Sequence, residues 1–166
     1  MHVDDDHRHY GSALIQIAED VQFTAINAVR YRAQNSRCGF RINTEIGVYI
    51  RYRSEPKGSR IPIYSFAFSD DNLAELRRMS KRLTKVFVAL VCVQDREICC
   101  LPYVDLEQLI NVRQEEKGEV EDEYVIEAWI APRKSFRVGI SPPNTKGKWS
   151  KSFVIPRNDF PRAIVR

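Results

Sequence analysis

The hydrophobic residues in the N-terminal part of the chain follow a helical spacing before they change to a strand-like one. Over residues 12–20 apolar side chains recur every three to four positions, and Ser12 stands where an N-cap is expected. This pattern predicts a short amphipathic helix. Residues 21–26 fit either an extension of that helix or a short strand, and the polar, basic residues 31–37 predict a loop.

Three segments with strand-like spacing follow, over residues 40–42, 46–53 and 61–68. The second segment alternates most regularly, with Arg51 and Arg53 on its polar face. A period of two residues is typical of a strand with one face buried and one face in water.

The middle of the chain predicts a helix over residues 70–83, because Ser69 can cap it, acidic residues open it and basic residues fill its later turns. Residues 86–93 are apolar on both faces, which is typical of a central strand. After a polar turn, residues 98–101 predict the partner strand of a hairpin.

The C-terminal part continues in the same manner. Its predicted elements are a helix over 105–113, an acidic connection over 114–123, a hairpin of strands 124–130 and 135–140 joined by 131–134, an exposed loop over 141–148 and a strand over 152–155. We therefore expect an α+β fold, in which two or three helices pack on a mixed, mostly antiparallel sheet of six to eight strands. Residues 1–11 are expected to be a polar tail, and residues 12–166 a single domain.

The apolar runs of the chain are short. None approaches the roughly 20 residues that a membrane-spanning helix needs, and the N-terminus is acidic and polar, unlike the basic and then apolar order of a signal peptide. We expect a cytoplasmic protein with no membrane partner.

Four cysteines stand at positions 38, 92, 99 and 100, three of them in apolar segments. Secreted disulfide scaffolds are usually shorter and richer in cysteine, so buried, reduced thiols are expected. A hairpin that pairs Val93 with Ile98 would place Cys92 opposite Cys99, where a disulfide or a shared metal is geometrically conceivable.

Catalytic and cofactor motifs are sparse. The three histidines, His2, His7 and His9, all lie in the first nine residues beside the acidic run 4–6. A chain terminus rarely holds a preformed metal site, and a Ser-His-Asp or Cys-His arrangement needs a histidine held near its nucleophile. No glycine-rich phosphate loop is present. We expect no catalytic residue, no metal site and no cofactor.

The order of predicted elements over about residues 12–101 is a helix, three strands, a helix and a strand. This order resembles the core of the PD-(D/E)xK nucleases. The resemblance implies Mg²⁺ held by an acid on one strand and a Glu-x-Lys pair on the next. In this chain residues 63–68 of the third strand offer neither a carboxylate nor a lysine, and Glu19 and Glu45 are the scattered acids nearby. Without these motif residues, the resemblance implies an inactive relative of the nucleases. A degenerate or active nuclease-like domain stays an alternative.

The charge of the chain is polarised. Residues 133–166 contain nine basic residues and one acid, Asp159, and carry a net charge of about +8. Over residues 146–153 cations alternate with aromatic side chains, the residue types that contact phosphates and stack on bases. Alternating cations also keep one face of a sheet in water, and Trp149 can equally belong to a core, so this alternative stays open.

We interpret the pattern as a non-catalytic domain that binds DNA or RNA through a basic C-terminal surface. Arg51 and Arg53, with Lys57 and Arg60 nearby, form a second possible patch. The candidate nucleic-acid-binding residues are Arg133, Lys134, Arg137, Lys146, Lys148, Trp149, Lys151, Arg51 and Arg53.

A second hypothesis belongs to a different functional class. The acidic residues within 115–123 lie just upstream of the basic tail. They suit a protein-interaction or self-assembly module, in which they meet a basic partner or the tail of a neighbouring copy.

Overall fold

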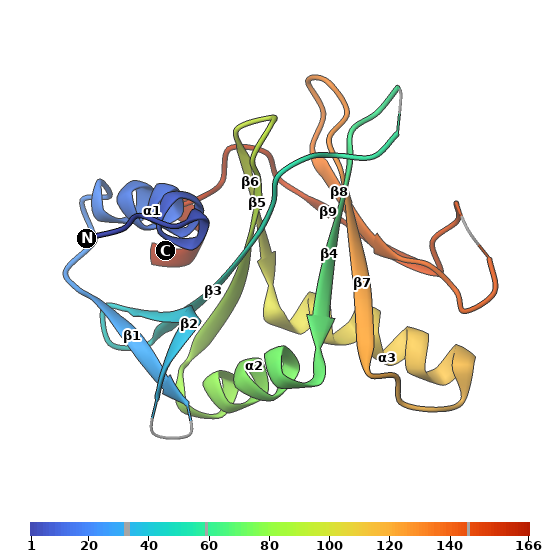
Figure 1. Cartoon of the computed structure of the whole chain (residues 1–166), viewed down its shortest axis with the longest axis horizontal. Helices are drawn as coiled ribbons and strands as arrows, with labels where there is room; N and C mark the ends of the chain where they lie inside the picture. Colours follow the sequence, from blue (N-terminus) through green and yellow to red (C-terminus); the bar gives the residue numbers. More distant parts are fainter. Residues whose placement is uncertain (32–33, 59, 146) are drawn as a thin grey trace.

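The computed structural model describes residues 1–31, 34–58, 60–145 and 147–166. These residues form four helices and nine strands (Figure 1). The helices are α1 (Asp5–Ala18), α2 (Asp70–Arg82), α3 (Tyr103–Lys117) and α4 (Arg162–Val165). The strands are β1 (Ile26–Tyr31), β2 (Gln34–Ile42), β3 (Ile46–Arg53), β4 (Ile63–Ser69), β5 (Lys85–Cys92), β6 (Glu97–Pro102), β7 (Glu123–Trp129), β8 (Phe136–Ile140) and β9 (Lys151–Ile155).

The strands are divided between two sheets. Sheet A has the order β1-β2-β3-β5-β6, and sheet B has the order β4-β7-β8-β9. Every pairing is antiparallel except that of β3 with β5. The predicted α+β class and the mostly antiparallel pairing are confirmed. The prediction of one sheet is corrected to two, and the strand count exceeds the expected six to eight because β1 and β2 pair through a polar stretch of sequence.

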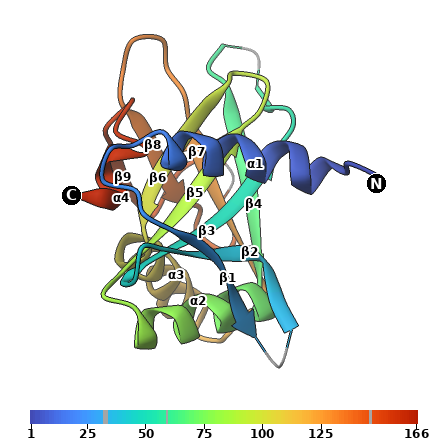
Figure 2. The same ribbon diagram turned by 90° about the vertical axis from the view of Figure 1, so that its left-hand side faces the viewer.

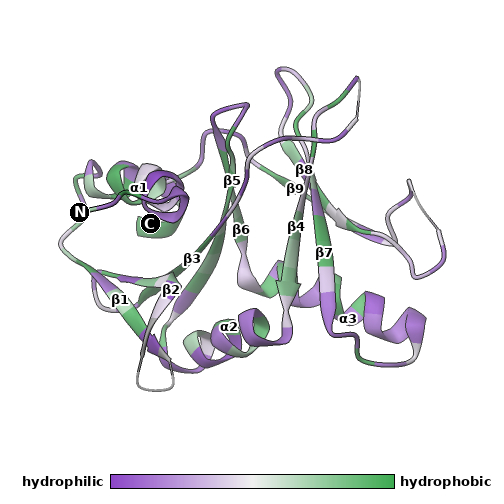
Figure 3. Cartoon of the chain, in the orientation of Figure 1, coloured by the Kyte–Doolittle hydropathy of each residue, from purple (hydrophilic) through white to green (hydrophobic). Residues whose placement is uncertain are grey.

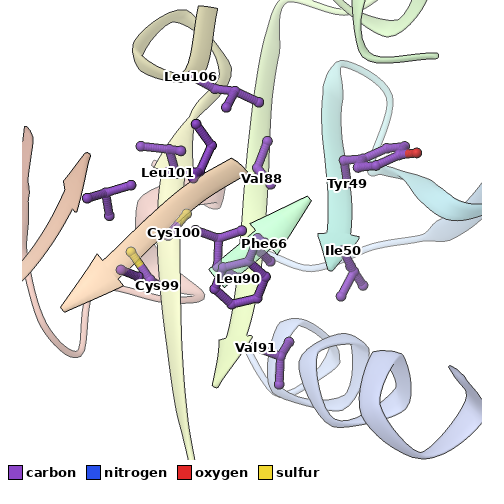
Figure 4. Close-up of a cluster of buried hydrophobic side chains, with 14 of the residues drawn as sticks. Tyr49, Ile50, Phe66, Val88, Leu90, Val91, Cys99, Cys100, Leu101 and Leu106 are labelled. Atoms are coloured by element: carbon purple, nitrogen blue, oxygen red, sulfur yellow. The ribbon is translucent and has the colours of Figure 1, made fainter. Parts of the chain in front are cut away.

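The main core lies between the two sheets. Phe66 of β4 lies beside Leu90 of β5, and Leu101 of β6 continues the cluster toward Leu106 of α3 (Figure 4). These side chains are 2% exposed or less. In Figure 3 the strands of both sheets carry most of the hydrophobic residues, whereas the far end of α3 and the loops are hydrophilic. The alternation seen in the sequence therefore marks the inner faces of the sheets.

Helix α1 covers the other face of sheet A (Figure 2). Ala13 and Ile17 are fully buried there, and the Tyr10 ring lies 5.6 Å from the Tyr52 ring, edge to face. Helices α2 and α3 lie together at one end of the molecule, where they close the space between the sheets (Figure 1).

Helix α1 begins at Asp5 rather than at residue 12, and so takes in most of the segment expected as a polar tail. Its N-cap is Asp4, whose carboxylate accepts a hydrogen bond from the His7 backbone N–H at 2.9 Å. The His7 ring in turn accepts from the Asp4 backbone N–H. This reciprocal cap, together with acids in the first turn, stabilises a helix start that apolar spacing alone does not reveal.

The loop predicted over residues 31–37 is corrected as well. Residues 21–25 form neither of the two predicted elements, since α1 ends at Ala18 and β1 starts only at Ile26. Ile26 pairs with Ile42 and Ala28 with Phe40. Positions 32 and 33 lie outside the described residues. Long-range pairing, rather than local composition, makes this polar segment a hairpin.

Helix α3 extends four residues beyond the predicted end at residue 113. Gly118 ends it with a left-handed φ of 77° and donates its N–H to the Gln114 carbonyl. Glutamate, glutamine and lysine are good helix formers, so the start of the predicted acidic connection continues the helix. Across the described ranges, no helix is both long and apolar enough to cross a bilayer.

Candidate nucleic-acid interface

The described basic residues of the C-terminal third do not gather on one face. Arg133 and Lys134 lie exposed in the turn between β7 and β8, where Arg133 adopts a left-handed φ of 58°. Arg137 is exposed on the outer face of sheet B, directly across from Trp129 in the register of β7 and β8. These three cations share one end of sheet B.

Lys151 points the other way. It pairs with the buried Ile140 in the register of β8 and β9, so its side chain lies on the opposite face of sheet B from Arg137. Its Nζ lies 5.5 Å from the centroid of the Phe153 ring. Lys148 is exposed, and Lys146 lies outside the described residues.

Other cations of the tail are held within the molecule. Arg157 donates to Glu97 at 2.8 Å and to the carbonyl of Ala131 at 2.9 Å. Arg166 pairs with Asp159 at 2.9 Å. The charge of about +8 counted along the sequence is therefore partly compensated and spread over several surfaces.

Trp149 packs within the protein. Its ring lies 4.8 Å from that of Trp129, and its Nε1 donates to Glu127 at 3.4 Å. It also covers Gly139, whose missing side chain provides the space. The half-buried indole thus has partners of its own in sheet B.

Arg51 and Arg53 line a separate pocket of about 590 Å³ beside α1, together with Arg37. Arg51 donates to the Ala67 carbonyl at 3.0 Å and lies over the Phe68 ring. Because Ala67 and Phe68 belong to β4, Arg51 links the two sheets. Arg53 is exposed in the same pocket.

A group of four arginines lines a groove of about 450 Å³ between the β1–β2 hairpin and α2. Arg30 comes from β1, Arg41 from β2, and Arg78 and Arg82 from α2. We call this site the arginine groove. Within the described part of the chain, no carboxylate pairs with Arg30, Arg41 or Arg82.

Local packing positions α2 beside the hairpin. Gly47 of β3 lets the side chains of Met79 and Leu83 approach the sheet, since a Cβ atom at position 47 would lie 2.8 Å and 2.9 Å from their terminal carbons. Arg78 and Arg82 are four residues apart and therefore share a face of α2. Docking of α2 on β3 thus brings that face next to Arg30 and Arg41.

One carboxylate, that of Glu75, is found among the described residues that line the arginine groove. It accepts a hydrogen bond of 2.6 Å from the Ser36 hydroxyl. The Ser36 Oγ accepts in turn from the Gly39 N–H at 2.9 Å. Glu75 is thereby fixed at the wall, so that the described lining of the groove contains four arginines and one acid.

Sequence reasoning missed this site for two reasons. The basic residues of α2 are explained in the sequence by their favourable interaction with the helix dipole. The polar residues 31–37 predict a loop, so the sequence gives no sign of the β1–β2 hairpin. The signal that was available is the basic run Arg77, Arg78, Lys81 and Arg82, which is longer than dipole compensation requires.

The element order that resembles the nucleases takes a different form in space. Strand β4, the third strand counted, belongs to sheet B, while β2 and β3 belong to sheet A. Glu19 lies at the C-cap of α1, and Glu45 lies in the turn before β3. No group of three or more potential metal ligands occurs among the described residues.

The four cysteines are buried and unbonded, as expected. The predicted register of their hairpin is wrong: Cys92 pairs with Glu97, and Cys99 pairs with Leu90. The turn holds four residues, as predicted, but it begins at Val93 rather than at Gln94, which shifts the pairing. Burial raises the pKa of the Cys92 and Cys99 thiols, which favours inert, protonated sulfur.

The acidic segment upstream of the tail is partly engaged within the molecule. The Glu121 carboxylate accepts two hydrogen bonds from Arg113, at 2.7 Å and 2.8 Å, and one from Lys117 at 2.9 Å. Glu116 accepts from the Ser150 hydroxyl at 2.7 Å. Two of its acids therefore fix the end of α3 against neighbouring segments.

Comparisons of the chain with models of known protein families, with curated protein sequences and with solved structures gave no match.

Proposed function

We propose that this protein binds DNA or RNA without a catalytic step, and that the arginine groove contacts the phosphate backbone. The observation that carries the proposal is the convergence of four arginines from three separate elements on one groove with a single acid. Such an arrangement has no evident role in holding the fold, because no carboxylate within the described residues pairs with Arg30, Arg41 or Arg82.

The chemistry of the guanidinium group supports phosphate as its partner. Its planar N–H fork matches two phosphate oxygens at once, and it stays charged at any physiological pH. The spread of the arginines over β1, β2 and α2 suits a ligand with successive phosphates rather than one small anion. Contacts of this kind depend on charge and carry little sequence preference.

The test is a fluorescence-anisotropy titration of labelled single-stranded RNA, single-stranded DNA and double-stranded DNA at about 50 mM salt and at higher salt. We expect measurable binding that weakens steeply with salt. The double variant Arg41→Ala/Arg82→Ala should lose about tenfold or more in affinity, and its plot of log affinity against log salt should be flatter by about 2.

The matched control is Arg133→Ala/Lys134→Ala, which removes the same charge from the exposed turn between β7 and β8. Its affinity should stay within about twofold of the parent protein, since rim charges contribute little. Absence of binding to all three probes at low salt refutes the proposed function. If the control variant loses affinity and the groove variant does not, the nucleic acid binds at the C-terminal cations, and the arginine groove is refuted as the interface.

A further inference from the structure

Another pocket, of about 670 Å³, lies on sheet B, away from the arginine groove. Its lining residues come from sheet B and from the segment that joins β8 to β9, and Figure 1 shows that segment on the opposite side of the molecule from β1 and β2. Trp129 and Trp149 form one wall, with their ring centroids 4.8 Å apart and their planes tilted by 51°. Pro142 and Pro143 add further apolar surface. A volume of this size accommodates a small ring-containing ligand.

A largely buried carboxylate stands beside the two indoles. The Glu127 side chain is 14% exposed, and its Oε2 lies 2.7 Å from the Nζ of Lys57. Its Oε1 accepts from Trp149 at 3.4 Å and from the Ser141 hydroxyl at 3.5 Å. These contacts hold the carboxylate in one orientation, which is the condition for directional recognition of a ligand.

Four of the five charged residues in the described pocket lining form two ion pairs, and the fifth, Glu123, is exposed to solvent. Glu127 is paired with Lys57, and Glu121 is paired with Arg113. An anion would meet the carboxylates, and a cation would meet the lysine and the arginine. A neutral ligand avoids both costs.

The remaining polar groups suit hydroxyl partners. Asn144 and Thr145 line the pocket near the tryptophans, and an amide and a hydroxyl can each both donate and accept. The apolar wall and the polar rim therefore require one ligand with a flat apolar face and an edge of hydrogen-bonding groups.

We propose that this pocket binds a neutral saccharide. The apolar C–H face of a sugar ring lies on the indoles of Trp129 and Trp149, and its hydroxyl groups donate to Glu127 and accept from Lys57. This inference is independent of the proposed nucleic-acid function, because no residue lines both sites.

The chain supplies its own reporter for the test, since it contains two tryptophans and both line the pocket. The probes are neutral hexasaccharides of glucose in β1,4 and α1,4 linkage, of xylose and of N-acetylglucosamine, titrated to millimolar concentration. We expect a saturable change in tryptophan emission, matched by heat in calorimetry, with at least one of them. Adenosine and guanosine are the neutral controls. The flat base of each can stack on an indole, but the base itself carries no hydroxyl groups.

Two variants separate the site from general effects on the fold. Glu127→Gln should weaken saccharide binding by about tenfold, because a charged acceptor is replaced by a neutral one. Arg137→Ala alters an exposed residue across from Trp129 and outside the pocket lining, and should leave the affinity unchanged. The proposal is overturned if no saccharide gives either signal, if a nucleoside binds more tightly than every saccharide, or if Glu127→Gln binds as well as the parent.

Discussion

The indole of Trp149 packs directly on the backbone of Gly139, so that a Cβ atom at position 139 would overlap the ring. Gly139→Ala should therefore displace Trp149 from sheet B and lower the free energy of unfolding by about 1–3 kcal/mol. The same change should shift tryptophan emission to longer wavelength as the indole enters water. Denaturant titration and emission spectra measure both effects.

Gly11→Ala is the matched control, because no atom lies within 4 Å of a Cβ at that position in α1. Alanine favours a helix, so this variant should be as stable as the parent or more stable by up to about 1 kcal/mol. An unchanged emission spectrum in Gly139→Ala would contradict the packing described for Trp149.

The bidentate contact between Arg113 and Glu121 should make stability depend on acid pH. Hydrogen bonding from Arg113, supported by Lys117, lowers the pKa of Glu121 from 4.5 to about 2. A lowered pKa in the folded state means that the stabilisation is present above pH 4.5 and is lost as the pH falls toward 2. We expect Glu121→Gln to cost about 1–3 kcal/mol at neutral pH and less as the pH drops through this window.

The test is to measure the free energy of unfolding of the parent protein and of Glu121→Gln from neutral pH down to the pKa of Glu121 in the folded protein. Glu123→Gln, at an exposed neighbouring carboxylate, should change little. A gap between parent and Glu121→Gln that stays constant on acidification would disprove the assignment.

Tyr64 joins the two sheets through its hydroxyl. It donates to the Asp95 carboxylate and accepts from the Asp95 backbone N–H at 3.1 Å, while its ring is fully buried. Tyr64→Phe leaves the ring in place and removes both bonds, so the free energy of unfolding should fall by about 1–3 kcal/mol. Asp95→Asn retains an acceptor and should cost less; equal losses in the two variants would argue against a charged hydrogen bond.

The buried thiols should resist modification. Burial raises the pKa of Cys100 to about 12 and raises those of Cys92 and Cys99 as well. The native protein is treated with a thiol-reactive disulfide reagent at mildly alkaline pH, and the thiol that the reagent releases is measured. At most one cysteine per chain, Cys38, should react in the native protein, whereas all four should react in denaturant. Rapid release of two or more equivalents from native protein would show that the hairpin opens readily.

The sequence was most informative where local pattern and final environment coincide. The cap of α2 at Ser69 is a local feature, and both α2 and β3 occur where they were predicted. The face of β3 that was expected in water is corrected, because residues 47–50 are buried on both faces. The hairpins β5–β6 and β7–β8 follow from turn residues between apolar runs.

Features that depend on distant partners could not be read from the sequence. The pairing of Ala28 with Phe40, and the departure of β4 from sheet A, are decided by which faces the whole chain can bury. The arginine groove depends on both, since it needs the hairpin and the docking of Met79 near Gly47. For this reason the cations that stand close together along the C-terminal third end on different surfaces, and those of the groove come from three places in the chain.

The order in which strands enter the two sheets bears on how the molecule can be divided. Strand β4 lies between β3 and β5 in the chain but forms the edge of sheet B, whereas β3 and β5 pair with each other in sheet A. A fragment that ends after β6 leaves β4 without its neighbour β7, and a fragment that starts at β7 lacks β4 altogether. Neither half of the polypeptide should survive alone, so protease cleavage in the β6–β7 region is expected to yield pieces that stay associated or unfold together.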